Sequence, residues 1–408
     1  MTELSRTNKV LALSIGQTLT TLSGIVSGMI LARILTKTDY ATIKQTFLAY
    51  NFVAPILMLG LPNALYYFLP RNENRQRGVT LDNILLLLGL AIIFSLFMAF
   101  GGYHLLAKRF NNTNLETTLK WMIFYPIYMM PVSILGAVLV YKEKVRILTF
   151  YNIFTQVLLG ICVILAVLFT YSYSGPLIIQ IILPAIFAFG AMYLIFSNLP
   201  KDSLKPSLKS MIEILKYSVP LGVASMIGTI MLQWDKIIVS AMCTPEEFAN
   251  YVNGAMEIPL IGIITGSIST IILADMSKLC HNGNKDEALR LFKTASIRSS
   301  AVLFPVMIFL LITAKPFIII LYSSKYIESI IPFTIFLLIL PVRTVMYGSA
   351  LMALGKTNII LYRSLFDLIV NAALSILFVH FWGYLGAAIA TVTTLYIWTI
   401  PYNLYFIG

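Results

Sequence analysis

The chain has 408 residues, 59% of them hydrophobic and only 11% charged, and its mean hydropathy is +0.86. A soluble domain is nearer half apolar and a quarter charged, so this composition excludes a soluble fold and indicates a membrane protein, whose apolar surface faces lipid. A net charge of +12 would suggest nucleic acid in a soluble protein. Here the charges lie in short loops between apolar runs, so we expect them to orient the chain in the membrane, with no nucleic-acid partner.

The apolar runs, taken in chain order, predict an all-α membrane protein with about twelve spanning helices, because each span needs about 20 apolar residues. The first run, Val10 to Leu35, is too long for the apolar region of a signal peptide and is interpreted as the first span. Prolines within the runs are tolerated where neighbouring helices and water satisfy the freed backbone. Helices are predicted near residues 10–35, 41–69, 81–106, 119–141, 147–171, 175–197, 217–242, 249–273, 300–322, 330–354, 359–381 and 385–407.

The loops predict the orientation. Six polar stretches lie on one side if the N-terminus is cytoplasmic, and together they hold 19 of the 29 Lys and Arg residues. They are the N-terminal tail, the loops after the second, fourth, eighth and tenth spans, and a basic stretch between the sixth and seventh. This excess predicts that both termini are cytoplasmic.

The basic stretch also divides the chain into a six-helix lobe over residues 1–199, a cytoplasmic linker over 200–216 and a second six-helix lobe over 217–408. A faint repeat supports two halves. The motif 36–41 (TKTDYA), after the first span, has a counterpart in 244–249 (TPEEFA), after the seventh. Pro131-Val132 in the fourth span matches Pro341-Val342 in the tenth. An even number of spans per half predicts parallel repeats related by a pseudo-two-fold axis along the membrane normal.

The same residues carry a resemblance that extends over essentially the whole chain. Four stretches resemble bacterial polysaccharide flippases, and their order and spacing are more specific than any one of them. They are Ala32–Tyr40, Tyr217–Leu221 followed by Gln233–Lys236, Ala353–Thr357 and Gly383–Thr391. The family is the O-antigen, or Wzx, type within the multidrug/oligosaccharidyl-lipid/polysaccharide (MOP) superfamily.

The resemblance implies two six-helix lobes that work by alternating access, and a substrate that is an undecaprenyl-pyrophosphate-linked oligosaccharide. It implies a bacterial inner membrane and a part in surface polysaccharide, O-antigen or lipopolysaccharide biosynthesis. Polysaccharide assembly proteins and membrane lipids would be partners, and we expect a monomer. Some relatives have fourteen spans, so this chain either lacks a final pair or is a shorter member.

Charged residues within spans are candidates for substrate binding, since their burial in a membrane is unfavourable. Arg343, in the tenth span, is the first candidate for the lipid pyrophosphate, followed by Arg33 at the end of the first span and Lys236 in the seventh. Glu257 faces the same expected cavity, as a proton carrier or as the structural partner of Arg343. Arg33 would alternatively reach the outer interface with its long side chain, and Lys236 would alternatively pair with Asp235.

A second group of side chains suits a coupling cation. Asp367 and Asn371 are four residues apart and so share one face of the eleventh helix, while Asp235 lies in the seventh span and Thr391 and Thr394 lie in the twelfth. Their oxygens suit Na⁺, or a carboxylate would carry a proton, and the resemblance to lipid II flippases implies a sodium site on the same helices. The alternative is that these polar groups only join helices by hydrogen bonds.

Three functions are therefore compared: a lipid-linked oligosaccharide flippase, a cation-coupled multidrug exporter of the same superfamily, and a membrane enzyme. An exporter of organic cations would favour an acidic or aromatic cavity, and Arg343 argues against it. An enzyme would need a large loop or a catalytic set at one interface, and the chain shows neither. The sequence predicts a transporter that is not an enzyme and has no cofactor apart from a coupling Na⁺ or H⁺.

Overall fold

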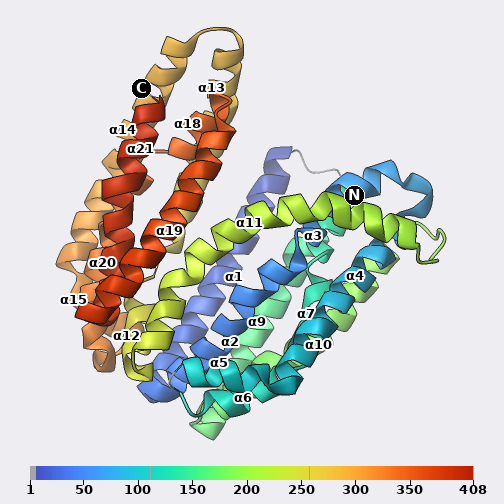
Figure 1. Ribbon diagram of the computed structural model, residues 1–408, viewed down its shortest axis with the longest axis horizontal. Helices are drawn as coiled ribbons and strands as arrows, with labels where there is room; N and C mark the ends of the chain where they lie inside the picture. The colour runs from blue at the N-terminus through green and yellow to red at the C-terminus, as the bar shows by residue number, and fades with distance from the viewer. Residues whose placement is uncertain (1–5, 111, 257, 408) are drawn as a thin grey trace. The chain divides into compact units, whose positions relative to one another are not determined.

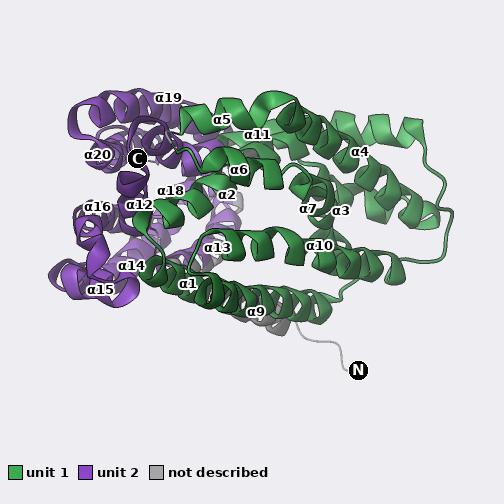
Figure 2. Ribbon diagram, turned by 90° about the horizontal axis from the view of Figure 1, so that it is seen from below, with its two compact units in different colours: residues 1–229 green, residues 230–408 purple. Residues whose placement is uncertain are grey.

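The computed structural model describes residues 6–110, 112–256 and 258–407, and within these ranges every regular element is a helix (Figure 1). The chain divides into two compact units, residues 1–229 and 230–408, and the long helix α11 runs through the boundary (Figure 2). The sequence places a linker at 200–216, whereas the structure begins α11 at Leu208. Residues 208–216 are too polar to be taken for part of a span, but none of them is a proline or glycine that would break a helix.

The first unit contains ten helices, two short turns and most of α11. They are α1 (Arg6–Ile34), α2 (Lys37–Met58), α3 (Leu61–Arg71), η1 (Glu73–Arg75), α4 (Gln76–Phe97), η2 (Met98–Gly102), α5 (Tyr103–Arg109), α6 (Leu115–Trp121), α7 (Tyr125–Val132), α8 (Leu135–Tyr141), α9 (Val145–Thr170), α10 (Ser174–Ser197) and α11 (Leu208–Met242).

The second unit continues from the end of α11. Its elements are α12 (Pro245–Gly254), α13 (Pro259–His281), α14 (Lys285–Ile312), α15 (Ala314–Tyr322), η3 (Ser324–Ser329), α16 (Ile330–Leu337), α17 (Leu340–Arg343), α18 (Tyr347–Ala353), α19 (Thr357–Trp382), α20 (Tyr384–Thr394), η4 (Leu395–Thr399) and α21 (Ile400–Ile407).

Among the described residues, eight helical segments are long and apolar enough to cross a membrane, and α6 with α7–α8, bent by 57°, makes a ninth. These overlap nine of the twelve predicted spans. The ninth span, predicted at 300–322, is displaced: its helix, α14, begins at Lys285 and ends at Ile312, and residues 314–322 form the separate helix α15. The other three coincide with α1, α11 and α12–α13, each of which includes side chains outside the description. The prediction of an all-α membrane protein is confirmed.

The core of the first unit is built where α3 packs between α4 and α8. Leu61, Leu65 and Leu69 recur every four residues on one face of α3 and are fully buried. The first half of α11 approaches this region backbone to backbone, because a Cβ atom on Gly222 would lie 2.2 Å from the carbonyl carbon of Leu59. Glycine at this position therefore lets α11 contact the break between α2 and α3.

The predicted repeat is visible as a capped helix start in each unit. Thr36 precedes α2, and its hydroxyl accepts from the Asp39 N–H at 3.1 Å; Thr244 precedes α12, and its hydroxyl accepts from the Glu247 N–H at 3.2 Å. In both motifs the next two residues, Tyr-Ala in the first and Phe-Ala in the second, are buried. The two six-residue motifs thus give the same local structure.

The fourth and tenth predicted spans are also broken and ended alike. Pro131 lies in the last turn of α7 and Pro341 in the first turn of α17, and each helix breaks within a few residues. At the end of each span a residue with positive φ follows the helix, Glu143 (58°) in one and Gly355 (72°) in the other. The next N–H, from a lysine in both cases, donates to a leucine carbonyl five residues earlier at 2.8 Å.

Candidate functional site

Arg343 ends α17 and lines a pocket in the second unit. The other walls come from the start of α13 and from α16 and α17, and they are almost wholly apolar. They comprise Met256, Ile258, Ile261, Gly262, Thr265, Phe333, Phe336, Leu337, Ile339 and Leu340. Arg343 is exposed, so its guanidinium can meet a ligand that enters. Among the described residues that line it, the pocket therefore joins a cation to apolar walls, which suits an amphiphilic anion.

The other predicted substrate residues lie in different settings. Arg33 is exposed in the last turn of α1. Lys236 is half-buried, and its ammonium donates within α11, to the Leu232 carbonyl at 3.4 Å and to Gln233 Oε1 at 3.5 Å. Glu257 lies outside the described residues. Arg343 thus lines a pocket, whereas a role in substrate binding for Arg33, Lys236 and Glu257 stays a prediction.

Asp235 is buried in α11 and accepts a hydrogen bond from the Tyr251 hydroxyl at 2.6 Å, from α12. Its other oxygen, Oδ1, is buried and has no hydrogen-bond partner among the described residues. Adjacent helical residues point about 100° apart, so the Lys236 ammonium turns to its own helix instead. A buried carboxylate with one vacant oxygen can accept a proton or a cation.

Asp367, the second predicted cation ligand, is held by neighbours on α19 and η4. It receives the Thr399 hydroxyl at 2.9 Å and pairs with Arg363, whose Nε lies 3.5 Å from Oδ2. Arg363 also donates to Asn403 Oδ1 at 3.1 Å, and the Asn403 amide donates to the Thr399 carbonyl at 2.6 Å. A guanidinium four residues earlier on the same helix thus already neutralises this carboxylate, and that spacing could be read from the sequence. The contacts from Thr399 and Asn403 could not, because both lie more than thirty residues away.

The remaining predicted ligands join helices locally. Asn371 donates to the Thr391 hydroxyl at 3.4 Å, linking α19 to α20, while the Thr394 hydroxyl donates to the Ala390 carbonyl of its own helix at 2.8 Å. Among the described residues, no cluster of three or more His, Cys, Asp or Glu side chains could hold a metal. Asn371 and Thr391 are therefore brought together, and no contact in the described part joins Asp235 to Asp367.

Lys44 is a cation that the sequence interpretation missed. It lies two turns into α2, half-buried against Gly28 of α1, and its ammonium is 5.2 Å from the centre of the Tyr40 ring. No carboxylate in the described part of the chain lies within ion-pair distance of it. A lysine so near the start of a predicted span is easily taken for an interface anchor, which is why Lys44 was not singled out.

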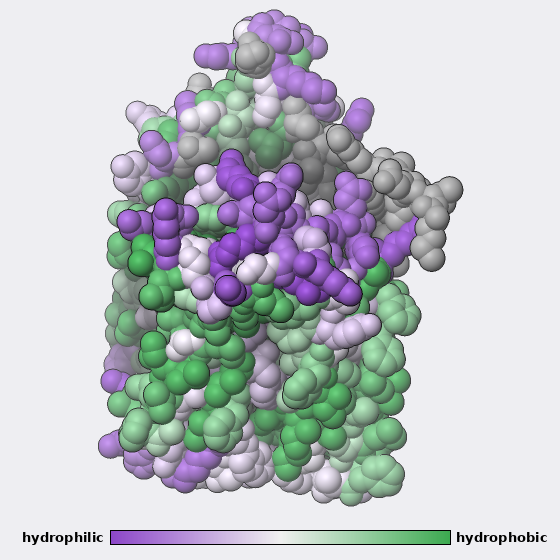
Figure 3. Space-filling view, turned by 90° about the vertical axis from the view of Figure 1, so that its right-hand side faces the viewer, coloured by the Kyte–Doolittle hydropathy of each residue, from purple (hydrophilic) through white to green (hydrophobic). Residues whose placement is uncertain are grey.

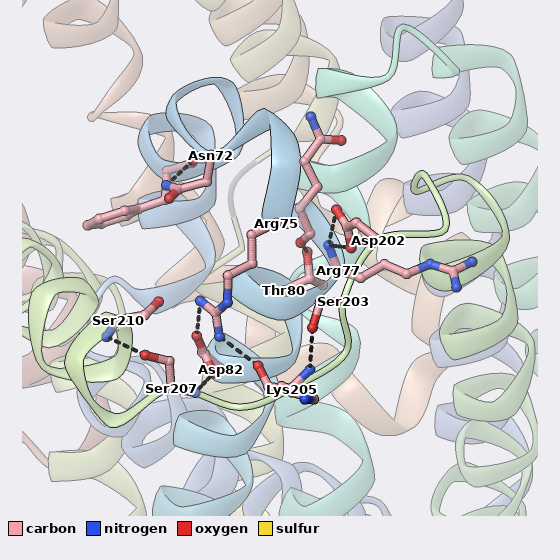
Figure 4. A network of polar contacts seen from close by, with 12 residues as sticks. Asn72, Arg75, Arg77, Thr80, Asp82, Asp202, Ser203, Lys205, Ser207 and Ser210 are labelled. Carbon is pink, nitrogen blue, oxygen red and sulfur yellow. Dashed lines mark hydrogen bonds and ion pairs between the residues drawn. The ribbon is translucent and has the colours of Figure 1, made fainter.

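Asp82 was also missed, and it fastens the linker to the first unit (Figure 4). Its carboxylate is fully buried, pairs with Arg75 at 2.9 Å and accepts the Ser207 N–H at 2.9 Å. Arg75 further donates to the Lys205 carbonyl at 2.7 Å, and the Arg77 N–H donates to Asp202 at 2.9 Å. The polar loop after α3 and the linker before α11 are thereby held together.

The sequence match decides the family. The family described as "Polysaccharide biosynthesis protein" matches residues 30–331, about three quarters of the chain. The chain belongs to this family. A comparison of the sequence with curated proteins found no match.

Solved structures show the fold of this polysaccharide biosynthesis protein. A structure described as lipid II flippase MurJ in an inward closed conformation is similar with a TM-score of 0.74 and 18% identity, over 98% of this chain and 87% of that one. An inward-facing multidrug resistance MATE family transporter of the MOP superfamily is similar with a TM-score of 0.68 and 14% identity, over 97% of both chains. A MOP superfamily transporter from Pyrococcus furiosus is similar with a TM-score of 0.66 and 14% identity, over 97% of this chain and 93% of that one. These likenesses show that the chain has the fold that the predicted superfamily implies.

Proposed function

We propose that this protein flips an undecaprenyl-pyrophosphate-linked oligosaccharide from the cytoplasmic to the outer leaflet of a bacterial inner membrane. Family membership ties the chain to polysaccharide biosynthesis, and the fold is that of MOP transporters. Alternating access requires that substrate and coupling ion bind the two states with different affinity. The product would feed assembly of a surface polysaccharide, and both termini would lie in the cytoplasm.

The observation that carries the proposal is the pocket at Arg343. A polyprenyl pyrophosphate is an anion attached to a long apolar chain, and its phosphate loses hydration when it leaves water. A guanidinium forms two parallel hydrogen bonds to phosphate and replaces that hydration. Apolar walls beside the guanidinium suit the first part of the prenyl chain. Lys44 in the first unit is another cation within a predicted span, and a cation there would also attract an anionic headgroup.

The same pocket argues against an exporter of organic cations, because Arg343 would repel a positively charged drug. The likeness to MATE transporters concerns the fold and does not decide between these substrates. Charge at the pocket therefore favours the lipid-linked anion.

The test is translocation of a fluorescent polyprenyl-pyrophosphate oligosaccharide in proteoliposomes. Wild-type protein is expected to translocate it, Arg343→Ala is expected to lose most of the rate, and Arg343→Lys is expected to keep part of it, since the charge stays but the paired hydrogen bonds are lost. Arg298→Ala, which removes an exposed arginine of α14, is the matched control and should translocate as wild type does.

Unchanged transport by Arg343→Ala would refute the role of this residue. If wild type fails where a known flippase works under identical conditions, the oligosaccharide is changed first and the efflux of an organic cation is measured next. Efflux without flipping would replace the proposal with the exporter function.

We further propose that transport is coupled to Na⁺ or H⁺ through Asp235. Its buried Oδ1 has no hydrogen-bond partner among the described residues, whereas Asp367 is paired with Arg363. Asp235→Asn is expected to remove the dependence of transport on Na⁺ or on pH, and Asp367→Asn is expected to leave that dependence in place. The opposite pattern would assign coupling to Asp367, and no change in either variant would reject both.

A further inference from the structure

The linker and the first turns of α11 combine exposed lysines with exposed apolar side chains. Leu208 and Ile212 are 78% and 52% exposed. Exposure of two large apolar side chains so close together is unfavourable in water and indicates a surface that something else covers. Lys205, Lys209 and Lys216 are exposed beside them. The described part of the chain thus covers neither these apolar side chains nor the lysines beside them.

Helix geometry sorts the two kinds of side chain onto neighbouring faces. At about 100° per residue, Leu208, Ile212, Val219 and Val223 fall within about 60° of one another. All four are exposed, and the last two lie in the predicted seventh span, where the solvent is lipid. Lys209 and Lys216 fall about 20–40° beyond the edge of this stripe. One apolar stripe therefore continues from the spanning part of α11 into its first turns, with lysines along one edge.

The segment is held in place by the network around Asp82. Arg75 binds both Asp82 and the Lys205 carbonyl, and Asp82 binds the Ser207 N–H (Figure 4). These bonds fix the chain on both sides of Pro206, directly before α11. In Figure 1 the first turns of α11 run at a steep angle to α4 and α10 of the same unit. The face that carries the linker shows polar residues gathered beside a belt of apolar ones (Figure 3).

We propose that the linker and the first turns of α11 (residues 204–216) form an interfacial anchor for anionic lipid headgroups. Leu208 and Ile212 would enter the boundary of the acyl chains, and Lys205, Lys209 and Lys216 would contact headgroup phosphates. Lipid fits better than a protein partner, because the apolar stripe continues along the same helix into the predicted seventh span, where lipid is the expected solvent, and because lysines lie along its edge. The side is the one that the loop charges assign to the cytoplasm, where anionic lipids attract basic segments.

The test places one fluorescent label on the full-length protein in nanodiscs, after replacement of the three native cysteines. A bimane at Leu208→Cys is compared with a bimane at Glu213→Cys, which lies off the stripe. Brominated phosphatidylglycerol and brominated phosphatidylcholine are the lipid quenchers, and iodide is the aqueous one. The label at 208 is expected to be quenched by lipid, with phosphatidylglycerol preferred several-fold, and the label at 213 by iodide.

The charge dependence is tested by changing Lys205, Lys209 and Lys216 to Gln together. A lysine near an anionic leaflet contributes about a fivefold factor in association, so the preference for phosphatidylglycerol should disappear while quenching by lipid remains. The matched variant changes Lys108, Arg109 and Lys315 to Gln, which removes the same charge elsewhere, and it should keep the preference. Folding of each variant is checked by size exclusion.

Three outcomes would overturn the proposal. The first is a label at 208 that iodide reaches, which would place the segment in water. The second is a label that neither quencher reaches, which would show that protein covers the segment. The third is a preference for phosphatidylglycerol that is absent from the wild type or survives in the lysine variant.

Discussion

Asp82→Asn tests the ion pair that fastens the linker before α11 to the loop after α3. The carboxylate is fully buried, while the Arg75 side chain is 28% exposed. Removing one partner of a buried pair costs about 3–5 kcal/mol, and removing one from a surface pair costs about 0–1 kcal/mol. Arg75 can regain part of its hydration, so we expect a loss of about 2–3 kcal/mol. Asp82→Ala also removes the acceptor of the Ser207 N–H, which adds about 1 kcal/mol.

The loss should be local, so the readout is hydrogen–deuterium exchange of the peptide that contains Ser207. A drop of 2–3 kcal/mol in the free energy of local opening speeds exchange by about 30- to 150-fold. Glu73→Gln removes an exposed carboxylate from the same loop and is the matched control, for which exchange should not change. If Asp82→Asn exchanges within about threefold of wild type, the ion pair does not hold the linker and the reasoning fails.

Three further predictions concern single positions. Gly222→Ala places a Cβ atom 2.2 Å from a backbone carbon at the α2–α3 break, so the yield of monodisperse protein should fall several-fold, whereas Gly228→Ala, whose Cβ meets nothing described within 4 Å, should purify normally. Burial and a neighbouring carboxylate raise the pKa of the Cys243 thiol to about 12, so at pH 8 only about one thiol in ten thousand is ionised. Mass spectrometry should therefore show slow labelling of Cys243 by maleimide, with a rate that rises about tenfold per pH unit. Rapid labelling at pH 8 would contradict the burial. Thr36→Ala and Thr244→Ala should each lower stability by about 1 kcal/mol and the melting temperature in one detergent by a few degrees, and an unchanged melt would show that the caps are dispensable.

Many of the helices could be predicted because the membrane imposes a strong and recognisable pattern on the sequence of each spanning segment. A spanning helix must satisfy its own backbone and present about 20 apolar residues, so length and hydropathy find it without tertiary information. The broken spans were harder. Pro131 and Pro341 mark the breaks, but whether proline kinks, breaks or merely bends a helix depends on what its neighbours supply. Likewise, the first turns of α11 form a helix although they lack the apolar content of a span.

The candidate site could be predicted only where a residue's own neighbourhood decides its role. Arg343 stood out because a cation deep in an apolar run is unusual, and the structure places it at a cavity. Asp367 looked equally suitable as an ion ligand, yet Arg363 and Thr399 neutralise and bind it. Asp82 went unnoticed because its partner Ser207 lies 125 residues away. Contacts across such separations leave no trace in local composition.

The matching starts and ends of corresponding helices also bear on how such proteins diverge. The two six-residue motifs share only their threonine and their final alanine, yet each forms the same cap and buries the same kind of pair. At the ends of the broken spans, Glu143 occupies the backbone conformation that Gly355 holds in the other half. The paired segments thus have the same bonding geometry although most of their residues differ. The chain likewise has the fold of a solved structure to which it is only 18% identical, over 98% of its length, so backbone geometry reveals this likeness more clearly than residue identity does.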